Sequence, residues 1–133
     1  MIVVDCSVAA AWALSDESGE WTRSARTAAE RDGIVVPWVF WFEIRNTLIV
    51  NERRGRIDAA DVERFIDELP KVIADVDGEP DGPAIMSLAR LHKLTVYDAA
   101  YLELSVRRGL PLCTLDKQLV AAAAKCGVDL WRP

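Results

Sequence analysis

Short apolar runs alternate with longer segments of helical periodicity along this 133-residue chain. Each run has the β-branched, continuous character of a strand buried on both faces. The predicted strands cover residues 2–4, 34–37, 71–76, 110–114 and 128–131. Strands that alternate with helices imply right-handed crossovers, so we predict an α/β fold: a three-layer α/β/α sandwich around a parallel sheet of about five strands.

The segments between these runs carry signals for the ends of helices. Ser7 is a plausible N-cap for a helix over residues 7–17, and Asp58 with Asp61 three residues later predicts a capped helix start. Pro83 suits the first turn of a helix, and Gly109 follows the end of another. The chain contains no repeat and no linker-like stretch, so we expect one domain over residues 1–133.

Composition narrows the class of protein. With 51% hydrophobic residues and five tryptophans, the chain can form a sizeable core. No apolar run approaches the roughly 20 residues of a membrane span, and no basic leader precedes the first apolar run, so we expect a cytoplasmic protein without membrane contact. Three cysteines without C-x-x-C spacing, and one histidine, favour buried reduced thiols over a zinc site or disulfides.

The charge balance limits how nucleic acid could bind. A net charge of -5 argues against binding driven by overall charge, because contacts with phosphate need local Lys and Arg. Arg107 and Arg108 form one candidate patch, and Arg53, Arg54 and Arg56 form another. Both patches lie at predicted helix ends, where favourable interaction with the helix dipole explains them equally well.

Acidic residues follow the predicted strands. Asp5 and Asp116 come directly after strands, Glu43 lies in the helix after the second strand, and Asp98 lies at a helix start. The carboxyl ends of parallel strands share one edge, where ligands gather in such sheets. Singly, three of these acids have structural explanations: Asp5 as a turn residue, Asp98 in a capping box with Thr95, and Asp116 as an N-cap.

Glu43 is harder to explain by local structure. It lies at the border of the helix face that carries Phe40, Ile44 and Leu48, where an unpaired charge costs roughly 2–7 kcal/mol. No Lys or Arg at helical spacing shares that face, which favours a cation held jointly with other carboxylates. Four oxygen donors without histidine or thiolate suit Mg²⁺ or Mn²⁺, and phosphodiester hydrolysis fits this inventory best.

The order and context of the acids resemble the PIN-domain ribonucleases, specifically the VapC-type toxins of type II toxin–antitoxin pairs. The resemblance rests on "VVDCSV", "VPWVFWFEIRNTL" and "TVYDAAYLELSVRRGLPLCTLDKQL", and it covers essentially the whole chain. It implies a PIN-like nuclease fold, Mg²⁺- or Mn²⁺-dependent endoribonuclease activity, an RNA substrate and a cognate antitoxin protein as partner.

Carried over by motif, the resemblance also implies roles for individual residues. It makes Asp5 and Asp98 the principal metal ligands, with Glu43 and Asp116 completing the acidic, catalytic pocket directly or through water. Ser7 and Thr114 match the hydroxyl positions beside the acids. Aromatic residues before Glu43 are denser than the family pattern leads one to expect.

The sequence argues against two other enzyme or signalling classes and leaves one alternative open. An aspartyl-phosphatase of the dehalogenase type needs a second Asp where Ser7 stands, and a phospho-receiver domain needs an acidic pair near the amino terminus. A PIN-fold binding module that cleaves nothing is the main alternative. Trp38, Phe42 and Ile49 form a second apolar stripe on the aromatic helix, which we expect to be covered by a second copy in a homodimer or by the antitoxin.

Overall fold

Four parallel strands form the centre of the molecule, in the order β3-β2-β1-β4. The computed structural model describes residues 1–14 and 19–133. The strands are β1 (Ile2–Val4), β2 (Ile34–Pro37), β3 (Ile73–Asp77) and β4 (Leu112–Cys113). The helices are α1 (Cys6–Ala13), α2 (Glu20–Asp32), α3 (Phe40–Arg53), α4 (Ala59–Glu68), the 3₁₀ turn η2 (Leu69–Lys71), α5 (Gly82–His92), α6 (Val96–Arg108) and α7 (Lys117–Lys125).

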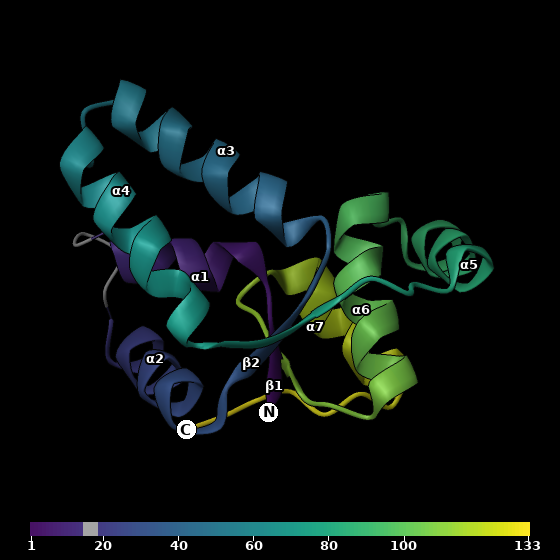
Figure 1. Ribbon diagram of the computed structural model, residues 1–133. Helices are drawn as coiled ribbons and strands as arrows, with labels where there is room; N and C mark the ends of the chain where they lie inside the picture. Colours follow the sequence, from purple (N-terminus) through teal and green to yellow (C-terminus); the bar gives the residue numbers. More distant parts are fainter. Residues whose placement is uncertain (15–18) are drawn as a thin grey trace.

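The helices form two layers, one on each side of the sheet (Figure 1). Helices α1, α2, α3 and α4 pack against one another on one side, and α5, α6 and α7 lie on the other. Helix α6 packs directly against β1 and β2. The predicted α/β sandwich with a parallel sheet is therefore confirmed. Among the described residues, no helix has the length and apolar character needed to cross a bilayer.

The burial of the strands depends on their position in the sheet. Every residue of β1, β2 and β4 is buried, as the apolar runs predicted. Strand β3 lies at the edge of the sheet and is largely exposed, which explains why Asp75 and Asp77 are accommodated within it. On α3 the predicted core face is also confirmed, because Phe40, Ile44 and Leu48 are at most 2% exposed.

Two sequence predictions about local structure were wrong. The expected fifth strand is reduced to a single parallel bridge between Leu112 and Leu130, so the sheet has four strands rather than about five. The N-cap of α1 is Asp5 and not Ser7, because the Asp5 carboxylate accepts the Val8 N–H. Helix α1 ends at Ala13; the rest of the helix predicted over residues 7–17 falls partly on 15–18, outside the described residues.

The backbone conformation at Gly33, between α2 and β2, requires a glycine. Its φ of +76° and ψ of 158° lie in a region that only glycine adopts readily, and a Cβ there would lie 2.8 Å from the Ala74 Cβ. We therefore expect Gly33→Ala to lower the free energy of unfolding by about 2–4 kcal/mol in urea titrations. Gly78→Ala is the control, since a Cβ there meets open space. Equal effects of the two changes would contradict the explanation.

Candidate active site

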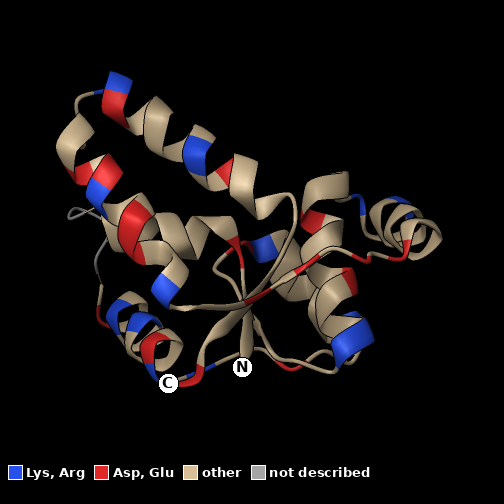
Figure 2. Ribbon diagram, viewed as in Figure 1, with Lys and Arg blue, Asp and Glu red and all other residues tan. Residues whose placement is uncertain are grey.

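The four acids predicted from the sequence line one cavity at the carboxyl edge of the sheet. The cavity has a volume of about 240 Å³ and is lined by Asp5, Cys6, Ser7, Glu43, Thr47, Asp98, Tyr101 and Asp116. Figure 2 shows acidic segments at the end of β1 and at the starts of α3 and α6. None of the described residues that line it is Lys, Arg or His. The cavity therefore concentrates negative charge without a cationic side chain.

Asp5 is the most deeply buried of these acids, at 4% exposure. Its Oδ1 accepts hydrogen bonds from the Ser7 hydroxyl at 2.8 Å and from the Val8 N–H at 3.0 Å. Its Oδ2 accepts a short hydrogen bond from the Thr114 hydroxyl. The two hydroxyl residues picked out by their motif positions thus do hydrogen-bond to an acid, and they fix the Asp5 carboxylate at the end of β1.

Asp98 and Asp116 combine the expected capping contacts with a place in the cavity. The Asp98 N–H donates to the Thr95 hydroxyl at 3.1 Å, and the Asp116 Oδ1 accepts the Leu119 N–H at 2.9 Å. The Asp116 N–H donates to the Thr114 hydroxyl oxygen at 3.0 Å. Thr114 therefore links the backbone at Asp116 to the Asp5 carboxylate. Contacts at a helix start and a place in the cavity are thus compatible, because Asp98 and Asp116 have both.

Glu43 has a partner that the sequence analysis missed. The Tyr101 hydroxyl, from α6, donates to the Glu43 Oε1 at 2.7 Å. The contact joins residues 58 positions apart, so it could not be seen from helical spacing around Glu43. A sequence signal did exist on the other helix, since Tyr101 follows Asp98 at i+3 and so shares its face. The hydrogen bond to one oxygen of this half-buried carboxylate therefore comes from a neutral phenol and not, among the described residues, from a Lys or Arg.

Comparison with known proteins agrees with this geometry. A family model described as the PIN domain matches residues 2–125, which include all four acids. The chain belongs to the PIN-domain family. This PIN-domain chain is 29% identical over 121 residues to Ribonuclease VapC3 of Pyrobaculum aerophilum, covering 89% of this chain and 91% of the relative. The resemblance to PIN-domain ribonucleases of the VapC type is thereby confirmed.

A solved structure supports the same fold. The crystal structure of PAE2754 from Pyrobaculum aerophilum superposes with a TM-score of 0.72 at 25% sequence identity. The match covers 91% of this chain and 83% of that one. This chain therefore shares its layered α/β fold with that solved structure.

Three acids of the cavity, Asp5, Glu43 and Asp98, have raised pKa values. Burial is the largest cause of the raised pKa of Asp5, Glu43 and Asp98. Repulsion adds to it, because each of these three carboxyls lies near the charge of at least one other acid of the cavity. Hydrogen bonds from Thr114 and Tyr101 act in the opposite direction on Asp5 and Glu43. Burial, reinforced by repulsion between the acids, therefore disfavours full ionisation of these three carboxyls.

The donor set fits a hard divalent cation. Carboxylate and hydroxyl oxygens dominate the polar groups of the cavity, and Cys6 is buried with its pKa raised to about 12, so the thiol stays protonated. In the described part of the chain, no three acidic, His or Cys side chains are already drawn together closely enough to hold an ion. Mg²⁺ commonly keeps several waters and takes only one or two carboxylates, which suits such an open arrangement.

Arg107 and Arg108 lie at the other end of α6 and form ion pairs. Arg107 contacts Asp77 at 2.6 Å and Glu103 at 2.5 Å, and Arg108 contacts Asp75 at 2.5 Å. The pairs with Asp77 and Asp75 tie the end of α6 to the edge strand β3, and the pair with Glu103 lies within α6. A contact of either arginine with RNA stays a prediction, and it would compete with these carboxylates for the guanidinium groups.

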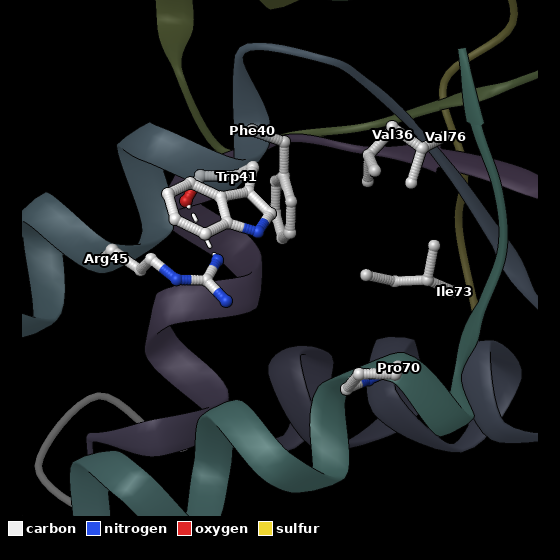
Figure 3. Close-up of a pocket in the computed structure, with 7 residues that line it drawn as sticks. All are labelled: Val36, Phe40, Trp41, Arg45, Pro70, Ile73 and Val76. Atoms are coloured by element: carbon white, nitrogen blue, oxygen red, sulfur yellow. Dashed lines mark hydrogen bonds between the residues drawn. The ribbon is translucent and has the colours of Figure 1, made fainter. Parts of the chain in front are cut away.

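A second cavity, of about 230 Å³, lies between α3 and β3 and contains no acid. Figure 3 shows Phe40, Trp41 and Arg45 facing Val36, Ile73, Val76 and Pro70 across it. The Arg45 guanidinium stacks 3.6 Å from the Trp41 ring centroid and donates to the Trp41 carbonyl oxygen. Arg45 thus lines this apolar cavity, whereas Glu43 lines the acidic one.

The raised pKa values predict how stability changes with pH when metal is chelated. A carboxyl whose folded pKa exceeds its ordinary value, 3.8 for Asp and 4.5 for Glu, stabilises the fold below that value. That contribution is lost as pH rises through the folded pKa, so the free energy of unfolding should fall above about pH 4.5. Asp77 has a lowered pKa, so its stabilising contribution is fully present above pH 3.8 and is lost only as pH falls below that value.

Urea titrations across this pH range, in EDTA, measure the effect. Asp5→Asn keeps the size of the side chain and an N-cap oxygen but removes the most buried carboxyl of the cavity. It should therefore make the fall in the free energy of unfolding with rising pH shallower. If the free energy of unfolding of the parent protein instead rises steadily above pH 4.5, the claim that the folded state raises the pKa values of these acids is contradicted.

Proposed function

We propose that this PIN-domain chain is a metal-dependent endoribonuclease that acts as the toxin of a toxin–antitoxin pair. One observation carries the proposal: carboxylates from four separate segments line a single cavity that no described Lys, Arg or His side chain enters. Such a charge concentration is costly unless it binds a cation. The name of the relative, Ribonuclease VapC3, supports the choice of RNA as substrate.

The residues of the cavity have distinct roles in this proposal. Asp5 and Asp98 would hold Mg²⁺ or Mn²⁺, with Glu43 and Asp116 completing the pocket directly or through water. When bound, the cation supplies an activated water and neutralises charge on the phosphate, which explains hydrolysis without a histidine base. Ser7 and Thr114 keep the Asp5 carboxylate oriented by donating to its two oxygens.

A PIN-fold binding module that cleaves nothing is the competing function. The two are separated by incubating the purified chain with RNA in Mn²⁺, and in parallel with EDTA. We expect cleavage only with the metal. If RNA stays intact under both conditions while the chain is folded and binds a protein partner, the enzymatic proposal is wrong.

Substituting Asp98 tests the metal site most specifically. Asp98→Asn keeps the size of the side chain and the Thr95 contact, which uses the backbone N–H, but removes a charge and a metal ligand. We expect it to abolish RNA cleavage and to blunt the rise in melting temperature caused by Mg²⁺ or Mn²⁺. The metal-free variant should be as stable as the parent, or slightly more stable, because repulsion is relieved.

Asp61→Asn provides the matched control. Asp61 holds the same position in the first turn of α4, where its N–H donates to Asp58 at 2.8 Å, but it lies outside the acidic cavity. Asp61→Asn should leave unchanged both RNA cleavage and the rise in melting temperature caused by the metal. If Asp98→Asn still cleaves RNA, responds normally to metal and loses about 1 kcal/mol of stability, Asp98 is only a helix-start residue.

The aromatic start of α3 is the proposed contact with a second copy of the chain. Trp38 is 64% exposed and Phe42 is 55% exposed, and their rings meet edge to face at 5.6 Å. Trp41 adds a third exposed ring beside Phe42, at 5.0 Å, while Ile49 is half-buried. Contiguous exposed rings of this kind mark protein contacts more often than free surface. The antitoxin is the other protein that could cover them.

Replacing two of these rings tests the homodimer. Because both side chains are largely exposed, Trp38→Ser with Phe42→Ser should change the stability of a single chain by less than about 1 kcal/mol. We expect sedimentation velocity to show a dimer for the parent chain and a monomer for the double variant. Val106→Ser, at an exposed position on α6, is the control and should remain dimeric. A monomeric parent chain would refute the dimer and leave the antitoxin as the candidate.

A further inference from the structure

We propose that Tyr101 is a positioning residue of the acidic site, whose hydroxyl fixes the Glu43 carboxylate relative to Asp98. The inference rests on the proposed metal-dependent function and assigns a role to a residue that is not one of the four acids. Tyr101 would act through Glu43 and would not itself ligate the cation.

The geometry of the contact supports this role. Tyr101 is 1% exposed and is one of the largest fully buried side chains, so packing fixes the position of its ring. Its hydroxyl donates to the Glu43 Oε1 at 2.7 Å. Among the described residues, no hydrogen bond to the Glu43 Oε2 is formed, which leaves that oxygen for the cavity.

The contact also supplies a restraint that α3 otherwise lacks. Glu43 lies in the first turn of α3, and the N-cap residue, Val39, makes no side-chain capping hydrogen bond. The starts of α1, α6 and α7, which carry or adjoin the other acids, are each capped by a side chain. Of the four described helix starts at the acidic cavity, α3 is thus the one without a side-chain cap, and a hydrogen bond from a buried residue of α6 tethers it.

The spacing of Asp98 and Tyr101 on α6 links the positions of two acids of the site, Asp98 and Glu43. Asp98 and Tyr101 are three residues apart on α6, so they lie on the same face of that helix. The bond from Tyr101 to Glu43 thus ties the position of the α3 carboxylate to the helix that carries Asp98. A displacement of either helix would change the separation of the two carboxylates.

A neutral donor suits this role better than a cationic one. A Lys or Arg at this place would neutralise Glu43 and compete with a metal ion for the same charge. The phenol donates one hydrogen bond and leaves the carboxylate negative. Burial and the nearby acid raise the pKa of Tyr101 well above its ordinary value, so the hydroxyl keeps its proton.

A purely structural role makes a different prediction. If the bond only satisfies a buried hydroxyl, its removal lowers stability and leaves metal binding unchanged. Tyr101→Phe removes the hydroxyl alone. We expect it to weaken Mn²⁺ binding, measured by calorimetry, by about 10–100-fold, and to lower kcat for RNA cleavage while KM for RNA stays within about twofold. Tyr97→Phe is the matched control, since Tyr97 is 58% exposed on the same helix.

A double-variant cycle tests whether Tyr101 acts through Glu43. In the Glu43→Ala background, Tyr101→Phe should cause no further loss of Mn²⁺ affinity. Glu43→Asp keeps the charge but shortens the side chain, so it should give a similar loss of affinity even if Tyr101→Phe does not fold.

The outcomes separate this inference from the proposed function. If the parent chain binds no Mn²⁺ and cleaves no RNA, both are overturned. If the parent chain is active and Tyr101→Phe binds Mn²⁺ and cleaves RNA as the parent does, only the role of Tyr101 is overturned. An undiminished effect of Tyr101→Phe in the Glu43→Ala background also overturns it.

Discussion

The burial of a carboxylate at the end of the central strand is the constraint on which the rest of the site depends. Asp5 is 4% exposed, and three donors from α1 and from the segment after β4 hold it. Burial still raises its pKa despite these donors. Three more acids then line the same cavity, and no described Lys, Arg or His side chain joins them. The fold thus keeps negative charge where an ordinary core would remove it.

The edge of the sheet shows that the chain can neutralise carboxylates elsewhere. Asp75 and Asp77 of β3 are paired with Arg108 and Arg107, and the pKa of Asp77 is lowered as a result. Among the described residues, the hydrogen bonds to the carboxylates of the acidic cavity come from hydroxyl and backbone donors, which orient carboxylates without cancelling their charge. This difference between two acidic groups of one PIN-domain chain is the main physical argument that the cavity is built for a cation. The aromatic rings beside it, at the start of α3, are a separate surface suited to a protein partner.

Local sequence patterns predicted what depends on local structure. The apolar runs gave β1, β2, β3 and β4, and strand ends placed Asp5 and Asp116 at one edge because the sheet is parallel. The terminal run failed as a strand because only Leu130 pairs with β4. The contacts of Tyr101 with Glu43 and of Arg107 with Asp77 were missed because they join segments distant in the sequence. Ser7 was misplaced as a cap because α1 already begins at Cys6, where the Asp5 carboxylate accepts the Val8 N–H.

Locating a bound Mn²⁺ ion by anomalous scattering, in crystals of the chain soaked with the metal, tests the central claim most directly. The account predicts an anomalous peak inside the acidic cavity, at ligand distance from the carboxylates of Asp5 and Asp98, with Glu43 and Asp116 in contact directly or through water. It also predicts that this peak disappears in crystals of Asp98→Asn. A soaked crystal with no peak in the cavity, or with Mn²⁺ bound only elsewhere on the surface, would contradict the claim that these four acids form a metal site.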